Sequence, residues 1–251
     1  MTLQALIFDV DGTLADTERD GHRVAFNRAF AEAELDWVWD VPTYGELLAV
    51  TGGKERIRYF IDQWAPSLPD VADQDTWIAE LHKAKTRHYL SLLERHEIPL
   101  RTGVARLIHE ARAAGIRLAI ATTTTPENVT VLLRSTLGED SPGWFDVISA
   151  GDIVPAKKPA PDIFHHALEA LGLAPTDCLA LEDSANGVRA SIGAGVPTLV
   201  TLNDYTRDDD VGAALSVVDQ LGEPGQPFTH IAGRRPPGEF IDLAALRALL
   251  A

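Results

Sequence analysis

The chain has 251 residues with 22 Lys and Arg against 37 Asp and Glu, so its formal net charge is −15 at pH 7. Such an acidic chain repels phosphates of nucleic acids and anionic membranes, and neither is an expected partner. The single cysteine, Cys178, excludes an internal disulfide and is expected in the core, and no apolar stretch approaches the ~20 residues of a membrane span. We expect a reduced, cytoplasmic monomer, large enough for one domain or for a core with an insert.

Short apolar runs bounded by turn residues predict five buried parallel strands. In chain order they cover residues 3–8, 117–121, 145–149, 178–181 and 196–201. The later strands alternate with helix-like segments at 104–115, 161–172 and 184–195, each of which ends near a glycine. This alternation predicts an α/β fold with a doubly wound, Rossmann-like parallel sheet.

The first two predicted strands are separated by more than 100 residues, whereas a single crossover needs about 30. Residues 17–93 show helical periodicity and no convincing strand. We therefore predict a Rossmann-like core formed by residues 1–15 and 94–251, with a small α-helical domain inserted at 16–93. The polar, Gly- and Pro-rich segment 203–240 is expected to be solvated surface, followed by a closing helix at 242–251.

Polar side chains follow the predicted strands at the end where parallel α/β sheets bind ligands. They are Asp9 and Asp11 after the first strand, residues 122–125 after the second, Lys157 and Lys158 after the third, and Glu182 and Asp183 after the fourth. Carboxylates gathered this closely require a cation, and an oxygen-only ligand set suits Mg²⁺. We predict an Mg²⁺ site with Asp9 and Asp183 as direct ligands, supported by Glu182 and the backbone carbonyl of Asp11.

Four segments resemble, in order, the sequence motifs of the haloacid dehalogenase superfamily of phosphotransferases. They are DVDGTL at 9–14, ATTTT at 121–125, KKPAPDIF at 157–164 and LEDSANG at 181–187. The resemblance implies that Asp9 attacks phosphorus to form an aspartyl phosphate. It also implies that Asp11 protonates the leaving oxygen and later takes a proton from water. Two residues apart on an extended strand, both side chains would face the same side.

The second and third motifs imply groups that bind the transferring phosphoryl group. Thr122 would donate a hydrogen bond to a phosphoryl oxygen, with Thr123 as the alternative. Lys158 would neutralise charge on the nucleophile and on the phosphoryl group, with Lys157 as the alternative.

In this superfamily a helical insert after the first motif is a cap that excludes water and selects the substrate. Segments 15–22 and 82–89 resemble the subfamily that contains β-phosphoglucomutase and phosphoglycolate phosphatase. TGGKERI at 51–57 is typical either of a helix N-terminus that binds phosphate or of an ordinary Gly-Gly turn. The expected substrate contacts are Glu18, His22, Thr51, Gly52, Gly53, Lys54, Arg56, Lys85, Thr123 and Asn128.

The pattern as a whole resembles the CbbY-type phosphatases that accompany the Calvin–Benson–Bassham cycle. That resemblance implies removal of the 1-phosphate from xylulose 1,5-bisphosphate, a Rubisco inhibitor, to give xylulose 5-phosphate. A bisphosphate needs two anion sites, which would explain Lys54, Arg56 and Lys85 in the insert of an acidic chain.

Three alternatives stay open. One is a phosphosugar mutase of the β-phosphoglucomutase type, although His22 lies one residue further from Asp9 than its counterpart in that enzyme. The second is a phosphatase for another small metabolite such as phosphoglycolate. The third is a metal-stabilised binding protein without activity.

Overall fold

The computed structural model describes residues 3–50 and 52–251, which divide into two compact units. The first unit, the core unit, comprises the chain up to Asp16 and Pro99–Ala251, and the second, the helical unit, is Thr17–Ile98. Among the residues described, no helix is both long and apolar enough to cross a membrane.

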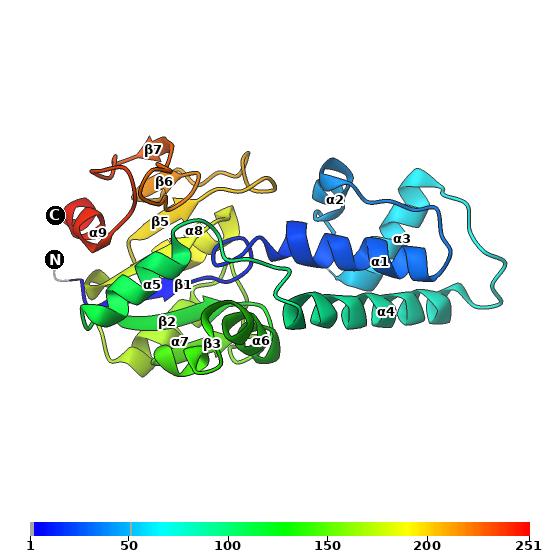
Figure 1. Cartoon of the computed structure of the whole chain (residues 1–251), viewed down its shortest axis with the longest axis horizontal. Coiled ribbons are helices and arrows are strands. Elements are labelled where there is room, and N and C mark those ends of the chain that lie inside the picture. Colours follow the sequence, from blue (N-terminus) through cyan, green and yellow to red (C-terminus); the bar gives the residue numbers. More distant parts are fainter. Residues whose placement is uncertain (1–2, 51) are drawn as a thin grey trace. The chain divides into compact units, whose positions relative to one another are not determined.

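Over residues 3–50 and 52–251, the strands all belong to the core unit. They are β1 (Ala5–Phe8), β2 (Arg117–Thr122), β3 (Val147–Ala150), β4 (Cys178–Glu182), β5 (Thr198–Thr201), β6 (Ser216–Val218) and β7 (His230–Gly233). Within the described residues they form one sheet in the order β3-β2-β1-β4-β5-β6-β7, parallel except for β7, which is antiparallel to β6 (Figure 1). Phe8, which ends β1, pairs with Ile120 of β2 and Leu181 of β4. The carboxyl ends of these three strands therefore meet at one edge, and the expected α/β fold is confirmed.

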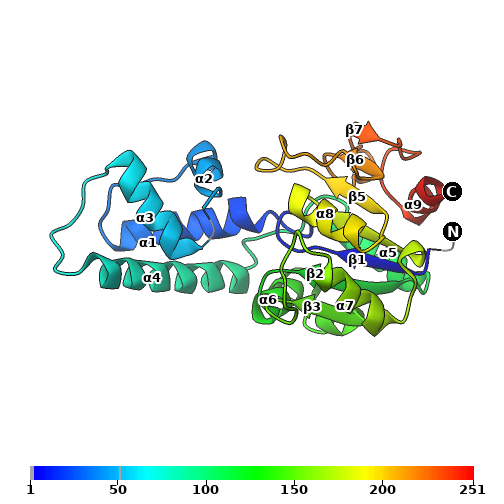
Figure 2. The ribbon, with the colours of Figure 1, turned by 180° about the vertical axis from the view of Figure 1, so that it is seen from behind.

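Helices cover both faces of this sheet. They are α5 (Val104–Ala113), α6 (Pro126–Leu137), α7 (Asp162–Leu171), α8 (Ala185–Gly193) and α9 (Leu243–Leu250), with short 3₁₀ turns at Ser141–Trp144 and Pro175–Asp177. Figure 1 shows α5 in front of the sheet, whereas Figure 2, from behind, shows α7 and α8 in front. Small strand residues such as Ala5, Ala119 and Ala180 pack against α7 and α8, which lets these helices approach the sheet closely. Gly172 ends α7 with a left-handed φ of 64°, as its sequence position indicates.

The structure corrects the sequence prediction in three places. The segment expected to be only solvated surface contributes β6 and β7, and the three residues of β6 are buried. A strand this short gives no periodic signal. Helix α6 was not predicted, because four consecutive threonines favour a strand, yet the Thr125 side chain caps it by accepting from the Asn128 N–H at 3.4 Å. Strands β3 and β5 begin two residues later than expected, after a 3₁₀ turn and after Pro197.

The helical unit is built around aromatic side chains. It contains the π-helix η1 (Thr17–His22) and the α-helices α1 (Arg23–Glu32), α2 (Val41–Leu47), α3 (Gly53–Trp64) and α4 (Gln74–Glu94). Helices α1 and α4 lie side by side (Figures 1 and 2). Phe26 and Phe30 of α1 pack against Trp39, whose ring centroid lies 4.6 and 4.8 Å from theirs. Asn27 bonds both the N–H and the carbonyl of Trp39 at 2.8 Å, which fastens the following loop to α1.

Candidate active site

Three buried carboxylates gather at the carboxyl ends of β1 and β4. Asp9 follows β1, Glu182 ends β4, and Asp183 comes next; their exposed fractions are 7%, 0% and 6%. One carboxylate oxygen of each lies within 4.8 Å of the others. They converge because β1 and β4 are neighbours in register. We refer to these three residues as the acidic cluster.

Lys158 forms the cationic side of this cluster. Its Nζ donates to Asp9 Oδ1 at 2.8 Å and to Glu182 Oε1 at 2.6 Å, and its side chain is 7% exposed. Burial alone would lower the pKa of Lys158, but the two carboxylates outweigh burial and raise it, so the group is an ammonium ion. Lys157, in contrast, pairs with Asp152 at 2.7 Å with its side chain 55% exposed. Of the two candidate lysines, the structure brings only Lys158 to the acidic cluster.

One lysine does not balance the three carboxyl groups of the acidic cluster. Burial, and then the charge of Asp9, raises the pKa of Glu182 to about 8 despite the opposing effect of Lys158. Burial, Asp9 and Glu182 raise the pKa of Asp183 well above its ordinary value. If all three carboxylates were ionised, one ammonium would leave two negative charges uncompensated, which is why these pKa values are raised. Glu182 Oε2 is also buried without a hydrogen-bond partner. The cluster therefore fits a divalent cation that prefers oxygen ligands.

Two glycines make room for these carboxylates. A Cβ on Gly187, in the first turn of α8, would lie 1.8 Å from Glu182 Oε2. A Cβ on Gly12 would lie 2.1 Å from Asp183 Oδ2, and Gly12 also has a φ of +82°. The glycines of the first and fourth motifs are thus required by the close approach of their backbones to the acidic cluster.

Asp11 and Thr122 lie at the same edge of the sheet but outside the acidic cluster. Strand β1 ends at Phe8, so Asp9 and Asp11 both follow the strand, and half-buried Asp11 begins the turn that its β-bridge to Ala15 closes. That the two side chains face the same side stays a prediction. Thr122 ends β2, is buried, and accepts from the Thr124 N–H at 3.3 Å.

The remaining predicted contacts of the core unit are less enclosed. Thr123 is exposed, and Asn128 is half-buried in the first turn of α6. Sequence reasoning missed Asn203, whose Nδ2 donates to Asp183 Oδ2 at 2.8 Å. Asn203 lies in the polar segment after β5, where a single asparagine gives no signal.

In the helical unit, Arg56, Tyr44 and Glu18 form a hydrogen-bonded chain. Arg56 Nη1 donates to the Tyr44 hydroxyl at 2.6 Å, and that hydroxyl donates to Glu18 Oε2 at 2.5 Å. Arg56 and Tyr44 are buried, and the guanidinium also lies 5.1 Å from the centre of the Tyr44 ring. Tyr44 was not predicted, because a single tyrosine in a short helix is indistinguishable in sequence from a core residue.

Lys85 and His22 form a second polar group in this unit. Lys85 Nζ lies 2.8 Å from His22 Nδ1 and 5.1 and 5.2 Å from the ring centres of Phe26 and Tyr89. Burial, followed by the charges of Lys85 and Arg56, lowers the pKa of His22 well below 6.5. His22 is therefore neutral at pH 7, and its Nδ1 accepts from the Lys85 ammonium.

The predicted phosphate-binding turn precedes α3. Gly52 caps the helix with a φ of 98°, and a Cβ on Gly53 would lie 2.3 Å from His82 Nε2. Lys54 is exposed in the first helical turn. Thr51 lies outside the described residues.

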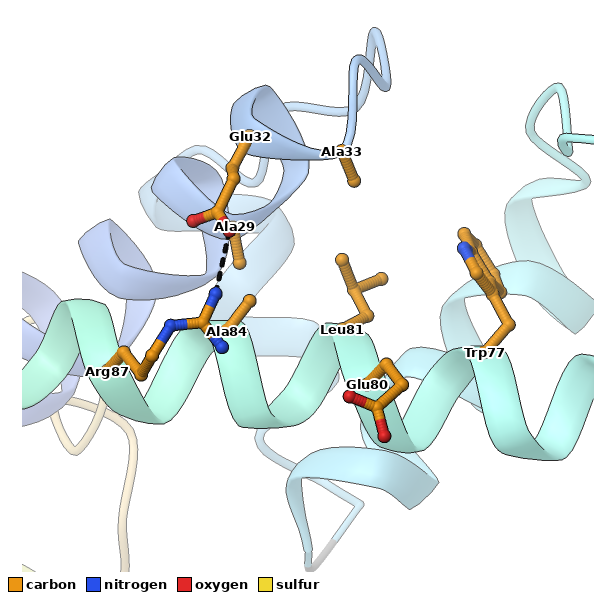
Figure 3. Close-up of a pocket in the computed structure, with 8 residues that line it drawn as sticks. All are labelled: Ala29, Glu32, Ala33, Trp77, Glu80, Leu81, Ala84 and Arg87. Atoms are coloured by element: carbon orange, nitrogen blue, oxygen red, sulfur yellow. Dashed lines mark hydrogen bonds and ion pairs between the residues drawn. The ribbon is translucent and has the colours of Figure 1, made fainter.

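The helical unit also has a pocket between α1 and α4, with a volume of about 240 Å³ (Figure 3). Its floor is formed by alanines and Leu81, and Arg87 of α4 pairs with Glu32 of α1 across its edge at 2.7 Å. None of the predicted site residues lines it.

The sheet order, the acidic cluster and its lysine define a class of enzyme. The chain matches the haloacid dehalogenase-like hydrolases over residues 3–195, and it belongs to this family. It is a phosphatase of that family.

The chain is similar over most of its length to several CbbY proteins. The chain is 49% identical over 247 residues to the CbbY protein of Cupriavidus necator, covering 98% of this chain and 96% of that protein. It is 41% identical to a CBBY-like protein of Arabidopsis thaliana, over 98% of this chain and 74% of that protein. A crystal structure of CbbY from Rhodobacter sphaeroides with phosphate has a TM-score of 0.72 at 46% identity, covering 87% of this chain and 95% of that one.

Proposed function

We propose that this phosphatase hydrolyses xylulose 1,5-bisphosphate to xylulose 5-phosphate and phosphate, with Mg²⁺ as its metal ion. The observation that carries the proposal is the buried acidic cluster joined to Lys158. A CbbY variant from Rhodobacter sphaeroides in complex with xylulose 1,5-bisphosphate, 47% identical with a TM-score of 0.72, supports the substrate. The removal of a Rubisco inhibitor would then be its role in the Calvin cycle.

In the proposed first step, a carboxylate oxygen of Asp9 attacks the phosphorus of the 1-phosphate. An oxygen–phosphorus bond forms on Asp9 as the ester bond to the sugar breaks. Asp11 gives its proton to the leaving sugar oxygen. Lys158, already bonded to Asp9, is placed to neutralise charge on the phosphoryl group, and Thr122 donates a hydrogen bond to one of its oxygens.

In the second step, Asp11 takes a proton from water, which attacks the phosphorus and releases inorganic phosphate. Asp9 is regenerated as a carboxylate. Asp9, Glu182 and Asp183, with the backbone carbonyl of Asp11, would bind Mg²⁺, which supplies positive charge for the phosphoryl oxygens when bound.

We propose that the helical unit is the cap and that its cations bind the 5-phosphate. Arg56 and Lys85 are each 9% exposed, and a buried cation is favoured by a bound anion. Lys54 and the N-terminal N–H groups of α3 add exposed donors. Glu18 and His22 would contact sugar hydroxyls.

The test is phosphate release from xylulose 1,5-bisphosphate, xylulose 5-phosphate and phosphoglycolate, with Mg²⁺ and with Asp9→Asn as the control. We expect one phosphate per bisphosphate, little release from either monophosphate, and none from the folded variant. Faster release from phosphoglycolate would refute the substrate. Transfer of the phosphoryl group to another hydroxyl, seen by phosphorus NMR, would show a mutase, and unchanged activity in Asp9→Asn would refute the nucleophile.

A further inference from the structure

Arg101 makes an unusual number of hydrogen bonds for one side chain. It lies just before α5, and its side chain is 9% exposed. Its Nη1 donates to the carbonyl of Gly12 and, at 2.8 Å, to that of Thr201. Its Nη2 donates to the carbonyls of Leu202 at 2.6 Å and Asp219 at 2.9 Å. The guanidinium thus joins the turn after β1 to the ends of β5 and β6.

Two of these acceptors adjoin the acidic cluster. Gly12 follows Asp11, and its Cα approaches Asp183 so closely that a Cβ there would clash. Leu202 precedes Asn203, whose amide donates to Asp183 Oδ2 at 2.8 Å. Fixing the Gly12 and Leu202 carbonyls therefore fixes the backbone on both sides of Asp183.

We propose that Arg101 is a positioning residue of the phosphatase site. It fixes the position of the turn after Asp11 directly, and it fixes the position of the Asp183 carboxylate through Asn203. The inference rests on the proposed roles of Asp11 and Asp183. None of the sequence motifs contains Arg101. Its planar guanidinium offers five donors in fixed directions, whereas a lysine in its place would keep the charge but could not satisfy four carbonyls.

Arg106 provides a matched control within the core unit. It also fastens backbone to backbone, because Nη1 donates to the Ile241 carbonyl at 3.1 Å and Nη2 to the Gly222 carbonyl at 2.8 Å, and it pairs with Glu223 at 3.0 Å. None of these partners adjoins the acidic cluster, nor do Glu110 and the Phe240 ring, which Arg106 also contacts. Arg106→Lys should therefore show how much thermal stability is lost when an arginine of this kind is replaced far from the acidic cluster.

The experiment compares Arg101→Lys with Arg106→Lys in the full chain. The readouts are thermal stability, Mn²⁺ affinity measured by electron paramagnetic resonance without substrate, and kcat and KM for a chromogenic phosphate monoester. We expect both variants to lose stability, but only Arg101→Lys to lose about 10–100-fold in Mn²⁺ affinity or kcat, as for other groups that orient metal ligands. Equal stability losses with wild-type kcat and Mn²⁺ affinity in Arg101→Lys would overturn the proposal.

Asn203→Ala tests the second half of the same connection and does not depend on the folding of an arginine variant. It should weaken Mn²⁺ binding with a smaller change in KM, and wild-type affinity would refute the path through Asn203. Because Mn²⁺ binding is measured without any sugar phosphate, its outcome is independent of the proposed substrate. If the wild-type chain bound no Mn²⁺, the metal assignment would fail, and kcat would decide the role of Arg101.

Discussion

Lys158 lies between two carboxylates that burial would otherwise leave without a partner. Its neighbour Lys157 has the same chemistry, and sequence alone left both as candidates. The two differ in what surrounds them, since Lys158 is buried against Asp9 and Glu182 and Lys157 faces solvent beside Asp152. The pair therefore offers a controlled comparison of one charge in two environments.

We expect Lys158→Met to lower the free energy of unfolding of the metal-free protein by about 3–5 kcal/mol, because it leaves buried charges uncompensated. Lys157→Ala should change it by less than about 0.5 kcal/mol, as for most surface ion pairs. Urea denaturation of both variants in a chelating buffer measures the difference. Similar losses in the two variants would contradict the role given to Lys158.

Because His22 is neutral in the folded protein, we expect the free energy of unfolding to depend on pH. Its pKa is lowered by burial, Lys85 and Arg56 in the folded protein, whereas the unfolded chain keeps a value near 6.5. Below that pH the His22 side chain binds a proton in the unfolded chain but stays neutral in the folded chain, so the free energy of unfolding falls as the pH decreases. Above about pH 7 neither state binds the proton, and this contribution is complete.

We therefore expect His22→Gln to lose less stability than wild type on acidification from about pH 7 to about pH 5. Urea denaturation at several pH values gives the two curves. His82, whose pKa is lowered mainly by burial, is present in both proteins and contributes to both curves. Parallel curves would show that His22 is not kept neutral by its surroundings.

At the scale of elements, the contact between α8 and Glu182 restricts which residue the helix can carry at position 187. Gly187 and Gly193 are both in this helix, and alanine usually stabilises a helix relative to glycine by about 0.5–1 kcal/mol. A Cβ on Gly193 would make an ordinary contact of 3.4 Å with Pro161, whereas one on Gly187 would lie 1.8 Å from Glu182 Oε2.

Gly193→Ala should therefore be neutral or slightly stabilising, and Gly187→Ala should destabilise and reduce phosphatase activity because Glu182 must move. Thermal denaturation and phosphate release from the two alanine variants test this. Equal behaviour of the two variants would show that Glu182 has room to shift.

Long apolar runs made most elements of the sheet predictable, because the sheet's central strands are buried on both faces. The motifs likewise predicted the acidic cluster, since β1 and β4 bring Asp9 and Asp183 together. Short or edge elements such as β6 were missed because three residues carry no period. Arg101 and Asn203 were missed for another reason: both act through backbone carbonyls or side chains brought together by the fold, and sequence shows no such partner.

At the scale of the whole molecule, the acidic chain has one described group of buried carboxylates suited to a metal ion. A cation that binds the folded chain only should stabilise it by about 2.7 kcal/mol at 100 times its Kd. For a chain of this size we expect Mg²⁺ to raise Tm by about 5–10 °C over NaCl of equal ionic strength.

Asp183→Asn should abolish this Mg²⁺-dependent shift, which scanning calorimetry can measure. Asp177→Asn is the control, because Asp177 precedes β4 and so lies at the other end of the strand from Asp183. A shift that survived in Asp183→Asn, or disappeared in Asp177→Asn, would place the ion elsewhere.

The central place of β1 also has a consequence for synthesis on the ribosome. This strand is made before the other strands of the sheet, and its neighbours β2 and β4 begin only at Arg117 and Cys178. Residues 17–98, which form the contiguous helical unit, emerge in between and can fold while β1 still waits for both partners. Asp9 is thus translated well before Glu182 and Asp183, and we expect the acidic cluster to be among the last parts of the core unit to be completed.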